Sequence, residues 1–239
     1  MAGTLYLGTS GYAYPEWKGV FYPPEVKVKD QLRYFASRFR SVEINYTYHH
    51  HPSEKTIAGW VSQTPPEFLF TLKAHQGITH RRRLKDCGDS VEFLVSRARQ
   101  LGERLGVILF QCPPTLRFEE DRAKEFLDTL PEGGRYAMEF RHASWEEARG
   151  LLRERGVAWC TAETDEQAAP TDSWEPFGYL RLRKEEYTDE ELAAWAARVR
   201  PALESGHDAF VYFKHEEKGM GPRFAERFEQ LMKEFAATG

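Results

Sequence analysis

The sequence has few cysteines, and that shortage excludes two kinds of cross-linked protein. The 239 residues contain only Cys87, Cys112 and Cys160. Three widely spaced thiols do not form the regular pairs of a disulfide scaffold or a zinc framework. We therefore expect reduced, mostly buried cysteines, as in a cytoplasmic protein.

Long apolar runs and a strong excess of one charge are also missing. No stretch of about 18 apolar residues occurs, so no membrane-spanning helix is expected. The first residues lack the basic-then-apolar order of a secretory signal. The net charge is −4, which does not favour binding to extended nucleic acid. These features predict a cytoplasmic protein without a membrane partner, and none of them indicates an oligomeric state.

What the chain does contain is a regular alternation of strand-like and helix-like segments. The eight predicted strands are Leu5–Thr9, Ser41–Tyr46, Phe68–Ala74, Val107–Gln111, Tyr136–Arg141, Val157–Ala162, Phe177–Arg183 and Ala209–Lys214. The seven predicted helices are Asp30–Arg38, Ser53–Ser62, Ser90–Leu105, Phe118–Leu130, Trp145–Arg155, Asp189–Leu203 and Pro222–Phe235. The helix after the sixth strand, between Thr164 and Pro176, is expected to be short or missing.

This order predicts an α/β protein with a parallel sheet, and eight units favour a closed (β/α)8 TIM barrel. No GxGxxG loop follows the first strand, which argues against a dinucleotide-binding open sheet. No internal repeat or low-complexity linker divides the chain. We expect residues 1–239 to form one barrel domain.

Polar residues alternate with apolar ones near the ends of the predicted strands. The apolar set suits packing against outer helices, so the polar set is expected to point into the barrel. The polar set is Ser10 or Thr9, Glu43, Asn45, Thr71, Lys73, Gln111, Glu139, Arg141, Glu163, Arg181, Arg183, Tyr212 and Lys214. Active sites of TIM barrels lie at this end of the strands. A structural ion-pair network is the alternative, because buried charges need partners.

The segment Ala137–Trp145 concentrates this chemistry. Glu139 and Arg141 share one face of a strand, and His142 follows directly. Ser144 is then expected to cap a helix, with Glu147 three residues later as in a capping box. His142 and His215 directly follow strand ends, so we rank them above the other histidines as groups that can titrate near neutral pH.

Several motifs together resemble a known family. They are Gly8–Pro23, Val42–Asn45, Phe68–Lys73, Gln111–Pro114 and Glu139–Trp145. The chain resembles the YecE-like family of unknown function (DUF72), which has a TIM-barrel fold. The resemblance implies a polar site at the strand C-termini and no established reaction. The chain departs from the pattern at three places, where Glu163, Arg183-Lys184 and Lys214-His215 replace the Asp, the His-Gly and the paired asparagines that the family often has.

The first functional hypothesis is a metal-independent enzyme that acts on a small anionic substrate, phosphorylated or carboxylated. Glu43 or Glu139 would serve as general acid or base, and Lys73 or Lys214 could instead form a Schiff base. The predicted catalytic residues are Glu43, Lys73, Glu139 and His142. The predicted substrate-binding residues are Tyr12, Asn45, Gln111, Arg141, Trp145, Glu163, Arg181, Arg183, Lys214 and His215. No cofactor and no metal ligand are assigned.

Two alternatives stay open. Glu43, Glu139 and Glu163 with a histidine could hold Mg²⁺, Mn²⁺ or Zn²⁺ in a hydrolase or isomerase, although no HExxH or paired-cysteine spacing is present. A non-enzymatic module could instead bind a nucleotide or a nucleic-acid end through the basic run Arg81–Arg83. In that case the aromatic residues Tyr12, Tyr14, Trp17 and Tyr22 would stack on bases.

Overall fold

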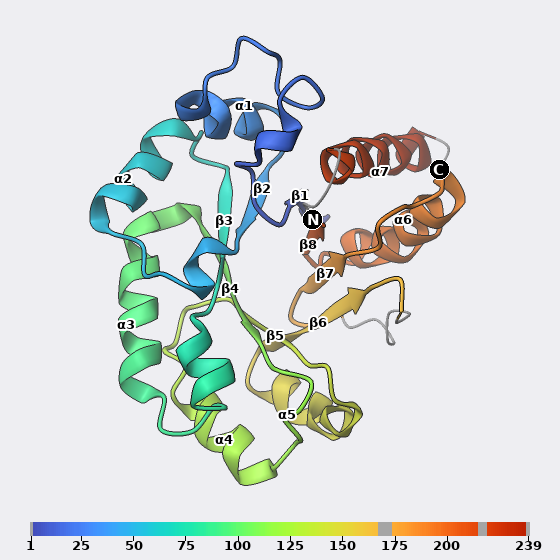
Figure 1. The fold of residues 1–239 in the computed structure, drawn as a ribbon. Coiled ribbons are helices and arrows are strands. Elements are labelled where there is room, and N and C mark those ends of the chain that lie inside the picture. The colour runs from blue at the N-terminus through green and yellow to red at the C-terminus, as the bar shows by residue number, and fades with distance from the viewer. Residues whose placement is uncertain (1, 167–173, 215–218, 238–239) are drawn as a thin grey trace.

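The structure is a computed structural model that describes residues 2–166, 174–214 and 219–237. Eight parallel strands form a ring inside a layer of helices (Figure 1). The strands are β1 Leu5–Thr9, β2 Ser41–Ile44, β3 Leu69–Lys73, β4 Leu105–Gln111, β5 Tyr136–Glu139, β6 Val157–Glu163, β7 Gly178–Leu182 and β8 Ala209–Phe213. The predicted (β/α)8 architecture is confirmed.

The ring is nearly closed. From β2 to β8 each strand pairs with the next along the chain, and β8 pairs with β1 from Leu5–Ala209 to Thr9–Phe213. Between β1 and β2 the contact is a single bridge from Ser10 to Glu43. Gly8 lies in this seam, where a Cβ atom would come within 1.8 Å of the Ser41 carbonyl oxygen. Only glycine permits this approach of the two backbones.

The helices cover the outside of the ring (Figure 1). They are α1 Gln31–Arg38, α2 Glu54–Gln63, α3 Gly88–Ala98, α4 Glu120–Asp128, α5 Arg149–Glu154, α6 Asp189–Glu204 and α7 Met220–Ala237. Between β6 and β7 the described residues 164–166 and 174–177 contain no helix, as expected. The rest of that connection lies outside the described residues.

Three helices are shorter than the sequence pattern predicted, among them α4, which ends at Asp128 instead of Leu130. The helix predicted to reach Leu105 ends at Ala98, and a 3₁₀ segment follows in which Gly102 has φ +60°. This non-helical break, which glycine adopts without strain, interrupts the 3₁₀ segment before β4 begins at Leu105. Before α5, Ala143–Ala148 forms a 3₁₀ helix instead of the first α turns.

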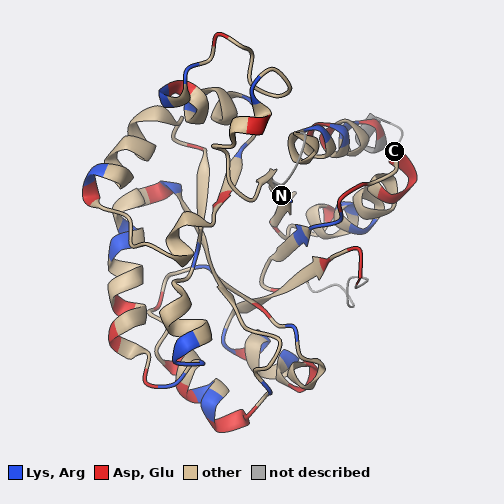
Figure 2. Ribbon diagram, in the orientation of Figure 1, with Lys and Arg blue, Asp and Glu red and all other residues tan. Residues whose placement is uncertain are grey.

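Two apolar layers hold the fold together. The larger one lies between the strands and the helices and includes Ile44, Leu72, Phe110, Leu180 and Phe213. The smaller one fills the barrel with Leu69, Val107, Leu109, Ala137, Ala158, Cys160, Phe177, Tyr179, Phe210 and Tyr212. Alternate residues of each strand enter the two layers. Charges of both signs are spread over the outer helices (Figure 2).

The three cysteines are buried and none is in a disulfide, so the prediction of buried free thiols is confirmed. Among the described residues, no helix is both long and apolar enough to cross a bilayer.

Candidate functional site

An arginine lies between two glutamates at the centre of the barrel. Nη2 of Arg181 donates to Oε1 of Glu43 at 2.7 Å, and its Nη1 donates to Oε2 of Glu139 at 2.5 Å. All three side chains are buried, with relative exposures of 1%, 0% and 1%. Residues that are 138 and 42 positions away from Arg181 in the chain thus form one ionic cluster.

Three further groups complete the hydrogen bonding of the carboxylates. The Tyr179 hydroxyl donates to Oε2 of Glu43 at 2.7 Å. Gln111 Nε2 donates to Oε1 of Glu139 at 2.8 Å, and Arg141 Nε donates to the same oxygen at 3.1 Å. The Arg141 side chain is 42% exposed, so it links the buried cluster to solvent.

These contacts keep both carboxylates ionised. Burial alone would raise the pKa of Glu139, but Arg181 and Arg141 lower it to about 2. Arg181 and the Tyr179 hydroxyl likewise lower the pKa of Glu43 against the effect of its burial. A general base works best when its pKa lies near the working pH. Glu43, Glu139 and Arg181 thus form a buried ion-pair network, and the acid–base role expected of the two glutamates stays a prediction.

Lys73, at the end of β3, has no ionic partner within the described part of the chain, in contrast to the two glutamates. Its ammonium nitrogen lies 4.3 Å from the centre of the Tyr48 ring. No carboxylate oxygen of the described residues lies within 4.0 Å of it. Burial and the charge of Arg181 lower the pKa of Lys73 to about 8, against the opposing effect of Glu43. Lys73 is therefore the group of this cluster that changes charge near neutral pH.

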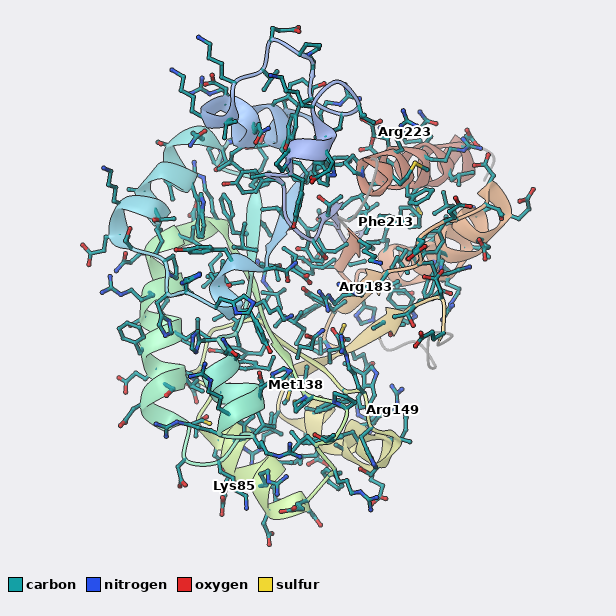
Figure 3. The ribbon with its side chains drawn as sticks, viewed as in Figure 1. Lys85, Met138, Arg149, Arg183, Phe213 and Arg223 are labelled. Carbon is teal, nitrogen blue, oxygen red and sulfur yellow. The ribbon has the colours of Figure 1, made fainter. Side chains whose placement is uncertain are left out.

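Arg183 adds a second cation without a described carboxylate partner. It extends from the end of β7, and Figure 3 shows it inside the ring, with Lys85 and Arg149 at the periphery. Burial, followed by repulsion from Arg181, lowers the pKa of Arg183. Lys73, Arg141, Arg181 and Arg183 thus face two carboxylates, an excess of two positive charges.

A cavity of about 590 Å³ opens beside this cluster at the C-terminal end of the barrel. Its lining includes Glu139, Arg141 and Arg183. Asp165, Glu166 and Glu185 line its solvent side and are exposed. Exposed charges are screened by water and salt, whereas buried ones are screened far less. The inner part of the cavity therefore carries weakly screened positive charge from Arg183, and its rim is acidic.

Two side chains of this site, Tyr48 and Tyr179, were not singled out from the sequence. Tyr179 lies two residues before Arg181, so the strand alternation could have placed it inside the barrel. Tyr48 comes from the loop after β2, and no pattern predicts that its ring reaches Lys73. The Tyr48 ring also contacts His80 at 5.2 Å. Burial and the nearby charge of Lys73 lower the pKa of His80.

The prediction that Glu163 points into the barrel is wrong. Its Oε2 accepts a hydrogen bond from Trp195 Nε1 of α6 at 2.9 Å, so the side chain faces the outer helices. The inward residues of β6 are instead Ala158, Cys160 and Ala162. Both faces of this strand are apolar near its middle, and alternation alone could not assign them.

Two predictions for the segment after β5 are also wrong. Trp145 is 1% exposed, stacks on Phe140 at 4.0 Å and donates from Nε1 to the Leu116 carbonyl, so it has no free surface for a substrate. The helix cap is His142, whose Nδ1 accepts from the backbone N–H of Ser144. His142 thus has a structural contact, and the Ser144 hydroxyl instead accepts from the Phe118 backbone N–H.

The other predicted residues are divided between the mouth and a second cavity. Gln111, Arg141, Arg183 and Lys214 lie at the mouth. Tyr12 and Asn45 line a separate cavity at the end of β2. His215 lies outside the described residues.

Both alternative functions lose some of the residues that were assigned to them. The described residues contain no group of three His, Cys, Asp or Glu side chains arranged to hold a metal ion. Of the three carboxylates proposed as ligands, two bind Arg181 and Glu163 faces outward. Trp17 and Tyr22 are each 1% exposed and pack in the core, so they are not available to stack on bases.

Comparison with known proteins supports the resemblance seen in the sequence. The model of the family described as "Protein of unknown function DUF72" matches residues 6–238. The UPF0759 protein YecE of Escherichia coli K12 is 31% identical over 161 residues, which span 64% of this chain and 57% of YecE. The UPF0759 protein YunF of Bacillus subtilis is 24% identical, with 90% of each chain covered. The crystal structure of a DUF72 family protein from Thermotoga maritima superposes with a TM-score of 0.83 and 27% identity, covering 96% of this chain and 99% of that one.

Proposed function

This chain belongs to the DUF72 family of proteins of unknown function, and we propose that its barrel mouth binds a small anionic substrate and acts on it by metal-independent acid–base chemistry. The substrate would be phosphorylated or carboxylated. The observation that carries the proposal is Lys73, a half-buried lysine with a pKa of about 8 in a cluster that has an excess of positive charge.

The roles of the residues follow from their electrostatics. Arg183 and Arg141 bind the anion, because a guanidinium can donate two parallel hydrogen bonds to a carboxylate or phosphate. Lys73 gives or takes a proton, because its pKa lies near neutral pH. Arg181, Glu43 and Glu139 hold these cations in place and are positioning residues. An anion in the mouth would also offset the repulsion that lowers the pKa of Lys73 and of Arg183.

Titration with inorganic phosphate tests the anion site. We expect saturable binding to the wild-type protein, measured by calorimetry at pH 7 and low salt. Arg183→Gln and Lys73→Met should each weaken the affinity about tenfold or more, which corresponds to about 1.4 kcal/mol. Arg33→Gln is the matched control, since Arg33 is 68% exposed on α1. No saturable binding, or an equal loss in the control, would contradict the proposal.

A panel of phosphorylated and carboxylated metabolites then tests turnover. Product formation should persist in metal-free buffer and rise with pH through about 8 if Lys73 acts as the base. In Lys73→Met this rise should be absent. Turnover that needs an added divalent ion would instead support the metal-dependent alternative.

A further inference from the structure

A second cavity, of about 330 Å³, lies at the C-terminal end of β2 and does not share lining residues with the mouth cavity. The loop after β1, the end of β2 and residues of α2 enclose it. Its walls include Tyr12, Tyr46 and Trp60. Its size suits a single ring system.

The aromatic residues around this cavity differ from those that only fill the core. Trp17 and Tyr22, on the same loop, are 1% exposed. Tyr46 is 51% exposed, and Tyr12 is partly exposed. Exposed aromatic rings that face a cavity offer a stacking surface, which any flat ring can use.

Asn45, which lines this cavity, carries a polar atom without a described partner. Oδ1 of Asn45 is buried, and no described residue donates a hydrogen bond to it. The adjacent Ser10 is fully buried, and its hydroxyl also has no described partner. Ser10 forms the bridge to Glu43, two residues before Asn45. Because an unpaired buried acceptor costs free energy, a ligand that donates a hydrogen bond to Asn45 would gain affinity.

We propose that this cavity binds a flat nitrogen heterocycle of the nucleobase class. The ring would stack on the aromatic walls, and an exocyclic amine would donate to Asn45 Oδ1. The carboxamide of an asparagine carries an acceptor beside its donors, the arrangement that matches the amine and ring nitrogen of adenine. A ring without an N–H donor would leave Oδ1 unpaired.

The two cavities together define a substrate class, and this inference rests on the anion-binding function proposed for the mouth cavity. Glu43 belongs to the mouth cluster, and Asn45 lies two residues further along the same strand end. The loop that carries the base site therefore continues directly from the strand that reaches the Arg181 cluster. The substrate is then a small nucleotide, with its base beside Asn45 and its phosphate beside Arg183.

Adenosine, AMP and inorganic phosphate separate the two sites in one set of titrations. We expect adenosine and phosphate each to bind the wild-type protein, and AMP to bind at least tenfold more tightly than either. Asn45→Leu removes the acceptor at similar volume, and Ala13→Trp fills the cavity from an exposed loop position. Both variants should weaken the affinity for adenosine at least tenfold and leave the affinity for phosphate unchanged. Lys73→Met should instead weaken the affinity for phosphate and leave that for adenosine unchanged.

A ligand change tests the hydrogen bond itself. Purine riboside lacks the exocyclic amine of adenosine, so it should bind several-fold more weakly to the wild-type protein and equally to Asn45→Leu. The proposal is overturned if adenosine does not bind, or if its affinity is unchanged in Asn45→Leu and Ala13→Trp. If adenosine binding depends on Asn45 while phosphate does not bind, the base site stands and the anion site is refuted.

Discussion

The ammonium of Lys73 lies 4.3 Å from the centre of the Tyr48 ring, so this half-buried cation faces an aromatic ring instead of a carboxylate. A cation–π contact compensates only part of the cost of removing a charge from water. The protein therefore retains a lysine that is unfavourable for stability at the mouth of its barrel. Such a trade is common where a residue serves function.

Replacing Lys73 should make the protein more stable. Below pH 8 the positive charge of Lys73 destabilises the folded protein. This destabilisation disappears as the pH rises from 8 to the ordinary lysine pKa of 10.5. We expect Lys73→Met to raise the free energy of unfolding at pH 7 by up to about 3 kcal/mol. Urea unfolding at pH 7 and pH 10.5 checks this, because the gain should vanish at the higher pH. Lys29→Met, at an exposed position, should change little, and a less stable Lys73→Met would refute the argument.

Removing Arg181 should be among the most damaging changes in the barrel. Glu43 and Glu139 would be left as buried charges without their common partner. We expect Arg181→Met to lower the free energy of unfolding by about 3–5 kcal/mol. The triple variant Glu43→Gln, Arg181→Met, Glu139→Gln removes all three charges and should recover much of that loss. A triple variant as unstable as the single one would show that the ionic cluster is not the cause.

The protein should lose stability in acid because of Glu139. Its folded-state pKa of about 2 lies below the ordinary value of 4.5, so its contribution is complete above pH 4.5 and is lost as the pH falls toward 2. That loss amounts to about 3 kcal/mol. Urea unfolding at steps between pH 5 and pH 2 should show a shallower decline for Glu139→Gln than for the wild type. Parallel declines would contradict the pKa shift.

Glu163 should matter for packing and not for the anion. Its carboxylate accepts from Trp195 on the outer side of β6. Glu163→Leu should cost about 1 kcal/mol of stability through the lost hydrogen bond. The phosphate affinity of Glu163→Leu should equal that of the wild type, whereas Arg183→Gln should bind phosphate more weakly. A weaker phosphate affinity in Glu163→Leu would place this residue back in the site.

The sequence alone was sufficient to predict the barrel fold and most of the polar residues that face into the barrel. Eight strand–helix units predicted the architecture, and the two-residue period of a strand put Glu43, Glu139 and Arg181 on the inner face. These are local properties, because backbone geometry sets which face of a strand each residue occupies. Where the period was ambiguous, as in β6 with apolar residues on both faces, the same logic misplaced Glu163.

Only the tertiary structure decided which groups meet. Arg181 contacts Glu43 and Glu139 because ring closure brings β2, β5 and β7 around one axis, and no spacing in the chain encodes those distances. The same closure sets the pKa values, since burial and neighbouring charges keep the glutamates anionic at neutral pH and leave Lys73 able to titrate. Strand periodicity thus determined the candidate residues, and three-dimensional proximity in a low-dielectric interior determined their chemistry.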